Sequence, residues 1–311
     1  MKAVFLDTAT LGQDIDLAPL EQVTGPMVKY DATARDQVAE RIRGFDTLLV
    51  NKVVLGREHF ENCPELKTIA VVATGLNNID LAAAKEHGIR VLNVTNYGRS
   101  TVAQHTMALI LALATRLLDY DRDVRAGRWA ESDMFCLMGH PIMELEGRTL
   151  GIVGYGDLGQ GVAERARAFG MNILLGARPG QPAGETDGYP RIPLDELLPQ
   201  VDVLSLHCLL TDETRNMIST RELQMMKPDS LLINTSRGGL VDEAALAAAL
   251  RTGVIGGAGF DVLTEEPPRR GNPLLAGDIP NLIITPHSAW ASREARQRIV
   301  EITARNLVSV A

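Results

Sequence analysis

The 311-residue chain has 45% hydrophobic and 23% charged residues, which is ordinary for a globular protein. Its formal net charge of −8 argues against a nucleic-acid partner or an anionic membrane surface, because both require a basic footprint. The length exceeds what one hydrophobic core usually supports, so we expect two domains and a small-molecule partner.

Three cysteines, Cys63, Cys136 and Cys208, have neither a metal-type nor a redox-type spacing. We therefore expect no disulfide framework and no metal site. The longest apolar stretch, residues 107–114, is far shorter than the roughly 20 residues of a membrane span. Together these features predict a cytoplasmic protein without a membrane segment.

The first part of the chain alternates short apolar runs with polar stretches that suit helices. This alternation predicts a βαβ series with a parallel sheet. The expected strands cover residues 2–7, 46–51, 66–74 and 89–95, and the expected helices cover residues 32–44 and 80–88. Residues 100–118 are almost continuously apolar and contain neither proline nor glycine, which predicts one buried helix that could link two domains.

A second βαβ series begins at Arg148. Its expected strands lie within residues 148–153, 171–177, 201–208, 230–236, 254–262 and 281–287. The glycine- and proline-rich residues 177–190 are expected to form an exposed loop. The last helix, residues 292–311, follows the final strand and could return to pack on the first domain, making that domain discontinuous.

The strongest local signal is GYGDLG, which stands directly after the strand GIV and directly before a helix. Gly154 permits a tight turn, Gly156 lets the backbone approach a pyrophosphate, and Gly159 allows the helix to pack closely on the strand. The phosphates would lie at the helix N-terminus, where N–H groups and the helix dipole favour anions. The order of strand, turn and helix predicts dinucleotide binding by residues 154–159, Asp157 and Leu158 included.

The next strand lacks the carboxylate that typically holds the ribose 2′-hydroxyl of NAD. Ala177 occupies the strand end and Arg178 follows it. An arginine at this edge could accept a 2′-phosphate, which favours NADP or the use of both cofactors. The alternative is a solvated arginine beside a proline turn.

Three further strand ends carry residues with acid–base or anion-binding chemistry. Arg237 follows the strand SLLINT, and its planar guanidinium suits a substrate carboxylate, with glycines after it that leave the fork unobstructed. Asp261 and Glu266 follow the next strand, and His287 follows the last one. Because clefts of α/β sheets lie at the carboxyl ends of the strands, these groups should converge where a carbonyl and an alcohol are interconverted beside a nicotinamide.

The combination of GYGDLG, NTSRGGLVDE, GFDVLTEEPP and TPHSAW resembles the D-isomer-specific 2-hydroxyacid dehydrogenases, and the resemblance covers nearly the whole chain. The run TPHSAWASREARQRIV is similar to the branch of glycerate dehydrogenases and hydroxypyruvate reductases. The resemblance implies a Rossmann NAD(P)-binding domain, residues 99–287, inserted into a flavodoxin-like substrate domain, residues 1–98 and 288–311. It also implies NAD(P)-dependent reduction of hydroxypyruvate or glyoxylate.

The resemblance assigns a role to each matching residue. Arg237 would bind the substrate carboxylate and polarise the keto oxygen, His287 would donate the proton, and Glu266, rather than Glu265, would hold His287. Further cofactor contacts would come from Cys208, Thr235, Ser236 and Asp261, and further substrate contacts from Lys52, Thr74, Gly75 and Trp290. Lys52 could instead be a solvated strand-end residue, and Trp290 could simply pack the last helix. Cys208 is expected to be a small buried group without thiol chemistry.

Other residues have structural interpretations. His105 and His140 show no carboxylate partner in the sequence and are expected to be structural. Met134, Met138 and Met143 are expected to fill an irregular apolar contact. The resemblance makes their segment an arm at a subunit interface, which predicts a homodimer.

Two other functions stay open at this point. One is a dehydrogenase for another 2-keto acid, such as 3-phosphohydroxypyruvate. The other is a dinucleotide-sensing interaction module that keeps the same fold and the same three residues.

Overall fold

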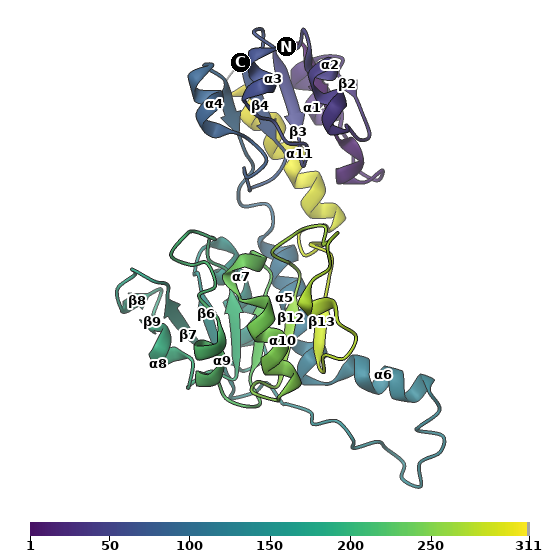
Figure 1. Ribbon diagram of the computed structural model, residues 1–311, viewed down its shortest axis with the longest axis vertical. Helices are drawn as coiled ribbons and strands as arrows, with labels where there is room; N and C mark the ends of the chain where they lie inside the picture. Colours follow the sequence, from purple (N-terminus) through teal and green to yellow (C-terminus); the bar gives the residue numbers. More distant parts are fainter. Residues whose placement is uncertain (310–311) are drawn as a thin grey trace. The chain divides into compact units, whose positions relative to one another are not determined.

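The computed structural model describes residues 1–309, and the chain divides into two compact units (Figure 1). Unit 1 contains Met1–Gly98 and Trp290–Ala311, and unit 2 contains Arg99–Ala289. Each unit has its own sheet with helices on both faces, parallel in unit 1 and mostly parallel in unit 2, which confirms the predicted fold class.

The sheet of unit 1 has five parallel strands in the order β2-β1-β3-β4-β5, which is the flavodoxin-like order. The strands are β1 (Ala3–Phe5), β2 (Val28–Lys29), β3 (Thr47–Val50), β4 (Thr68–Val71) and β5 (Arg90–Leu92). The helices are α1 (Ala18–Thr24), α2 (Val38–Ile42), α3 (Arg57–Glu61), α4 (Leu81–Glu86) and α11 (Arg293–Val308), with short 3-10 turns at Thr8–Leu11 and Arg35–Gln37. The predicted last helix is therefore present as α11, and its two final predicted residues, 310–311, lie outside the described part.

Successive residues of β1 point to opposite faces of the sheet and enter different apolar clusters. Val4 joins the cluster beneath α2, α3 and α4, whereas Phe5 joins the cluster beneath α1 and α11. The last helix thus completes the core of the first unit, where Ile299 and Leu307 are fully buried.

The sheet of unit 2 has eight strands in the order β13-β12-β11-β10-β6-β7-β9-β8, with β8 antiparallel to β9 and all other neighbours parallel. The strands are β6 (Thr149–Val153), β7 (Asn172–Ala177), β8 (Gly184–Thr186), β9 (Tyr189–Pro193), β10 (Val203–Leu206), β11 (Leu231–Asn234), β12 (Gly257–Phe260) and β13 (Leu282–Ile284). The order reverses between β6 and β10, which is the position where open α/β sheets bind dinucleotides.

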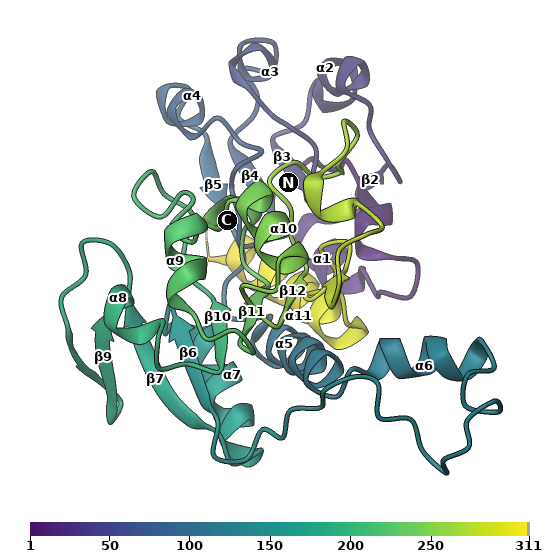
Figure 2. The ribbon, with the colours of Figure 1, turned by 60° about the horizontal axis from the view of Figure 1, so that its bottom comes forward.

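Helices α5 (Arg99–Ala114) and α7 (Asp157–Ala168) cover one face of this sheet, and α8 (Leu194–Leu197), α9 (Thr220–Met225) and α10 (Glu243–Arg251) cover the other. Short 3-10 turns lie at Gly238–Leu240 and Pro273–Leu275. Helix α6 (Leu117–Arg125) and the segment after it extend away from the body of unit 2 in both ribbon views (Figures 1 and 2).

Two expectations about unit 2 are wrong. Residues 177–190 are not simply a loop, because they contain β8 and the start of β9, which pair across a turn at Asp187 and Gly188. The predicted helix over 100–118 is broken, because Arg116 adopts a left-handed conformation with φ 55° between α5 and α6.

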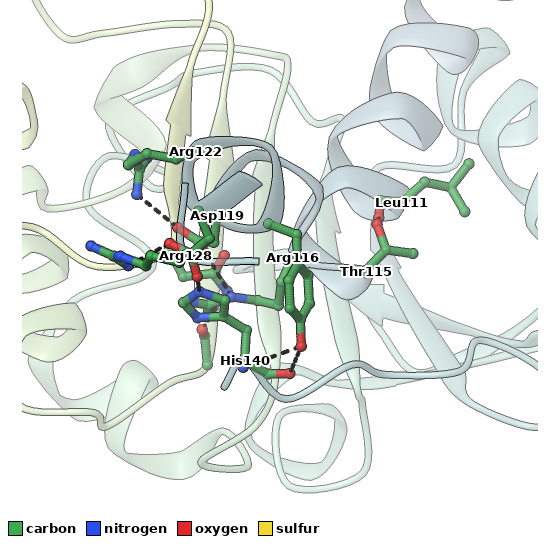
Figure 3. Close-up of polar contacts among 11 residues, drawn as sticks. Leu111, Thr115, Arg116, Asp119, Arg122, Arg128 and His140 are labelled. Atoms are coloured by element: carbon green, nitrogen blue, oxygen red, sulfur yellow. Dashed lines mark hydrogen bonds and ion pairs between the residues drawn. The ribbon is translucent and has the colours of Figure 1, made fainter. Parts of the chain in front are cut away.

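Polar contacts hold this break in place (Figure 3). The Thr115 hydroxyl donates to the Leu111 carbonyl at 2.7 Å, and Arg116 forms an ion pair with Asp119 at 2.7 Å. Among the described residues, no single helix is long and apolar enough to cross a membrane; α5 and α6 reach that length only as a pair bent by 58°.

Candidate active site

The turn between β6 and α7 has the geometry that a dinucleotide-binding turn requires. Gly154 has φ 101°, and a Cβ there would lie 2.4 Å from the backbone of His207 and Cys208. A Cβ on Gly159 would lie 2.2 Å from the Gly154 carbonyl oxygen. A Cβ on Gly156 would meet no described atom within 4 Å, so its backbone faces open space at the start of α7. The turn therefore fits a pyrophosphate.

The neighbouring fingerprint residues have other contacts. Asp157 begins α7, where its carboxylate lies 3.4 Å from the Arg99 guanidinium, and Leu158 is half-buried.

A pocket of about 390 Å³ opens where β7 ends. It is lined by Ala177 and Arg178 together with Asp195, Glu213, Arg221 and Glu222, among others. The guanidinium of Arg221 is already paired with the carboxylates of Asp195 and Glu222. The two arginines of this lining thus face three carboxylates, and Arg178 is the arginine that is not paired with Asp195 or Glu222.

The ends of β10 and β11 are tied together beside the glycine turn. The Ser236 hydroxyl donates to the Cys208 carbonyl at 2.7 Å, and the Thr235 hydroxyl lies 3.1 Å from the Thr106 hydroxyl of α5. Burial raises the pKa of the Cys208 thiol to about 11, so this thiol is protonated and unreactive at neutral pH.

Arg237 follows β11 with an extended backbone, and its guanidinium donates to the Ser236 carbonyl at 2.7 Å. A Cβ on the adjacent Gly238 would lie 2.0 Å from the Leu263 carbonyl carbon. Only glycine therefore allows the loop after β12 to approach Arg237 this closely. That loop carries Glu266.

Glu266 and His287 form a short hydrogen bond, 2.5 Å between Oε2 and Nδ1. The other carboxylate oxygen accepts the Leu263 N–H at 2.7 Å. Glu265 points elsewhere and pairs with Arg270 at 2.7 Å. Because an ionised carboxylate only accepts, the Nδ1 of His287 carries the proton and Nε2 is the imidazole atom suited to proton exchange with a ligand.

The electrostatics of this pair favour the ionised carboxylate. Burial opposes ionisation of Glu266, but the hydrogen bonds from His287 and the Leu263 N–H, with the charges of His287 and Arg237, outweigh it and hold the pKa of Glu266 below its usual range. The arrangement can hold an imidazole in one orientation and stabilise its positive charge.

Asp261 lies at the same edge of the sheet, but its carboxylate is buried and turned toward the chain. It accepts the Thr285 hydroxyl at 2.5 Å and the N–H groups of Ser288 and Ala289 at 2.9 and 2.8 Å. The backbone of His287 between these residues has φ 53°, an uncommon conformation for a residue with a side chain. Asp261 thus holds the strained turn that presents His287.

Two histidines of unit 2 have contacts that sequence reasoning missed. The Nε2 of His105 lies 2.9 Å from the Thr285 hydroxyl and 3.6 Å from the Asp261 carboxylate, a partner that was not visible in the sequence. The sequence feature that could have indicated this partner is the position of His105 within a long apolar helix, where a polar side chain needs a buried polar partner. His207 lies against Gly154, and burial lowers its pKa to about 4, which keeps it neutral.

His140 also has a carboxylate partner that was not visible in the sequence. Its Nε2 lies 2.9 Å from the Asp123 carboxylate of α6, which also pairs with Arg128 (Figure 3). The three methionines differ in burial. Met143 packs against the apolar cluster between the sheet of unit 2 and helices α5 and α7, whereas Met134 and Met138 are exposed. Within one chain, those two do not fill an apolar contact.

The predicted substrate contacts of unit 1 lie after β3 (Lys52), after β4 (Thr74 and Gly75) and before α11 (Trp290). Lys52 follows β3, and its Nζ lies 5.7 Å from the centre of the Trp290 ring. Trp290 is partly buried against the cluster beneath α11. Thr74 precedes Gly75 after β4, and its hydroxyl donates to the Val94 carbonyl at 2.7 Å, so its side chain is used in holding the loop.

Comparison with known proteins gives concordant results. The family model described as D-isomer specific 2-hydroxyacid dehydrogenase, NAD binding domain, matches residues 107–289. The glycerate dehydrogenase of Methylorubrum extorquens is 44% identical over 306 residues, which cover 96% of this chain and 93% of the relative. The hydroxypyruvate reductase of Blautia hydrogenotrophica is 38% identical, covering 99% of this chain and 96% of the relative. A solved structure of an acyclic imino acid reductase in complex with NADPH and D-Arg has a TM-score of 0.86 and 28% identity, covering 100% of this chain and 97% of that chain.

Proposed function

The chain belongs to the D-isomer specific 2-hydroxyacid dehydrogenase family, a family of oxidoreductases, and from this premise we propose that it reduces hydroxypyruvate. The smaller 2-keto acid glyoxylate is the second proposed substrate, and glycerate oxidation is the reverse reaction. The names of the glycerate dehydrogenase and the hydroxypyruvate reductase described above support this choice. The observation that carries the proposal is the contact between Glu266 and His287 at the strand-end edge that also presents Arg237.

The proposed chemistry follows from these three side chains. Arg237 binds the substrate carboxylate through its two parallel N–H groups and polarises the keto oxygen. His287 delivers a proton from Nε2 to that oxygen as it becomes a hydroxyl. Glu266 keeps the proton on Nδ1 and stabilises the charged imidazole before transfer. In the reverse direction, His287 removes the proton from the hydroxyl.

A nicotinamide dinucleotide, when bound, would supply the hydride for reduction of the second carbon of the substrate. Gly154, Gly156 and Gly159 would hold its pyrophosphate at the start of α7. The remaining proposed cofactor contacts are Asp157, Leu158, Ala177, Arg178, Cys208, Thr235, Ser236 and Asp261. For Asp261 the contact would be indirect, because its carboxylate already binds residues 285, 288 and 289.

We propose NADP, or both cofactors, as the form that is used. Ala177 offers no carboxylate for a ribose 2′-hydroxyl, and Arg178 lines the same pocket. NADPH is also the cofactor named for the imino acid reductase of similar fold. The carboxylates of Asp195, Glu213 and Glu222 in the pocket limit the expected preference for a 2′-phosphate.

We assign substrate binding to residues 1–98 and 288–311 and cofactor binding to residues 99–287. Lys52, Trp290 and the backbone at Thr74 and Gly75 are the proposed substrate contacts outside unit 2. The free thiols of Cys63, Cys136 and Cys208 support a cytoplasmic location. The apolar side chains exposed on the segment after α6 support a homodimer.

The decisive experiment follows nicotinamide absorbance while purified protein is offered hydroxypyruvate with NADH or NADPH. Turnover is expected with both cofactors, and kcat/KM with NADPH is expected to be at least equal to that with NADH. Arg178→Ala should lower the NADPH value more than the NADH value. Turnover confined to 3-phosphohydroxypyruvate would replace the substrate, and no turnover of any 2-keto acid would overturn the proposal in favour of a dinucleotide-sensing interaction module.

A further inference from the structure

Asp7 is a buried carboxylate of unit 1 that binds the backbone next to Lys52. It lies at the end of β1 and is only 3% exposed. Its Oδ1 accepts the Asn51 N–H at 2.8 Å, and its Oδ2 accepts the N–H groups of Lys52 and Val53 at 2.6 and 3.2 Å. Three consecutive amides of the loop after β3 therefore point at one carboxyl group.

Burying the Asp7 carboxyl group costs free energy of solvation, which an apolar side chain would not lose. Burial raises the pKa of Asp7, although the hydrogen bonds from Lys52, Asn51 and Val53 and the positive charge of Lys52 oppose this effect. A buried carboxyl group loses its hydration and recovers that loss only through well-formed hydrogen bonds. What the arrangement provides is a loop whose direction is fixed at three successive residues.

The opposite side of the same loop is held as well. The Asn78 amide donates to the carbonyls of Asn51 and Val53 at 3.4 and 2.9 Å, and the Asn51 amide donates to the Thr10 hydroxyl at 3.0 Å. Residues of two other segments, 7–10 and Asn78, thus hold the backbone of this loop, from which the exposed side chain of Lys52 extends. The Lys52 ammonium lies over the Trp290 ring.

We propose that Asp7 is a positioning residue for substrate binding, which fixes the backbone of residues 51–53 so that the Lys52 ammonium meets the substrate carboxylate. The inference rests on the proposed function, in which Lys52 is a substrate contact. Asp7 itself touches neither the substrate nor the cofactor.

Asp7→Asn tests the inference, because an amide keeps the size of the carboxyl but places an NH₂ group against N–H donors. The expected result is a KM for hydroxypyruvate raised about tenfold, with kcat within about twofold of wild type and an unchanged KM for the cofactor. Asn78→Ala, which releases the other side of the loop, should shift the same KM in the same direction. This second variant keeps the test open if Asp7→Asn does not fold.

A double-mutant cycle with Lys52→Met separates positioning from general destabilisation. In the Lys52→Met background, Asp7→Asn should no longer change the KM for hydroxypyruvate. The matched control is Asp46→Asn. Asp46 also accepts a backbone N–H in unit 1, from Lys2 at 3.0 Å, but it lies before β3, whereas Asp7 binds the loop after β3. It should leave the KM unchanged.

The outcomes distinguish the two proposals. If wild type turns over no 2-keto acid, the proposed function fails. If wild type is active but either Lys52→Met or Asp7→Asn keeps the wild-type KM for hydroxypyruvate, the inference about Asp7 fails and the proposed function stands. An equal effect of Asp7→Asn with and without Lys52 would also overturn the inference.

Discussion

Arg237 is the single residue on which substrate binding is expected to depend most. Arg237→Lys keeps the positive charge but loses the planar pair of N–H groups. We expect kcat/KM for hydroxypyruvate to fall about 100-fold in this variant, and further in Arg237→Ala. Steady-state kinetics measure the loss, and an unchanged cofactor affinity is the control. If Arg237→Ala had the same kcat/KM as wild type on every 2-keto acid, Arg237 would be excluded as a substrate ligand.

The lowered pKa of Glu266 has a consequence for stability. The ionised carboxylate stabilises the fold fully above the unfolded-state pKa of about 4.3, and this contribution is lost as the pH falls through the lower pKa of the folded protein. Glu266→Gln cannot titrate, so its Tm should fall less steeply than that of wild type between about pH 5 and about pH 3. The difference is expected to stay within about 1 kcal/mol, because a third of the side chain is exposed.

Thermal unfolding of both proteins across this pH range measures the two slopes. The double variant Glu266→Gln with His287→Ala is the control, since it lacks both partners and should show the slope of Glu266→Gln alone. Parallel curves for wild type and Glu266→Gln would show that the Glu266 carboxylate contributes nothing to the pH dependence.

The sequence predicted the proximity of Glu266 and His287 better than it predicted the partners of other histidines in unit 2. Arg237, Glu266 and His287 follow three strands of one series. Because parallel strands bring their carboxyl ends to one edge of the sheet, the sequence alone predicts that these residues lie close together. The partners of His105 and His140 could not be foreseen in this way. They depend on how α5 packs against the sheet and on the fold of an irregular segment, which no sequence period specifies.

At the level of elements, the turn from β6 to α7 requires glycine at two positions for different reasons: Gly154 for the fold of the turn, and Gly156 for the approach of the cofactor. Gly154→Ala would strain a positive φ and force a Cβ into the backbone of residues 207 and 208. We expect a loss of about 3 kcal/mol of stability or more, together with loss of cofactor binding. The measurements are denaturant unfolding and fluorescence titration with NADPH.

Gly156→Ala is the matched control at this turn. Its φ is −87° and its Cβ would meet no described atom within 4 Å, so the stability of the protein without cofactor should stay within about 0.5 kcal/mol of wild type. The affinity for NADPH should nevertheless fall at least tenfold, because the methyl group would occupy the approach of the pyrophosphate. Unchanged NADPH affinity in Gly156→Ala would place the phosphates elsewhere.

Helices and strands with a strong hydrophobic period were predicted from the sequence. The hairpin of β8 and β9 and the break between α5 and α6, which have no such period, were not. The predicted family is confirmed, and so is the pair of α/β sheets. The hairpin of β8 and β9 was missed because its sequence contains several glycines and prolines and its strands are short, with no buried residue. The break after α5 was missed because residues 100–118 keep good helix formers through Arg116, where the backbone turns left-handed.

At the scale of the whole molecule, the segment after α6 is the clearest candidate for contact with a second copy. Trp129, Phe135, Met138 and Ile142 are all exposed there, with Phe135 91% exposed. Phe135→Asp should therefore raise the dissociation constant of the proposed dimer about 100-fold. Sedimentation velocity over a range of concentrations measures this change.

Phe169→Asp is the matched control, because Phe169 is a partly exposed phenylalanine at the end of α7 and not on this segment. It should leave the sedimentation coefficient unchanged. A wild-type protein that sediments as a monomer at every concentration would contradict the proposed homodimer.

The position of α11 imposes an order on how the protein is made. Residues 1–98 leave the ribosome before α11, yet their sheet lacks Ile299, Val300 and Leu307, which fill the core beneath β1 and β4, until α11 has been synthesised. Unit 2 is continuous in sequence and can close its core earlier. The nascent chain therefore carries an uncovered apolar face of the first sheet while the second unit folds, and this interval is when chaperones would be needed.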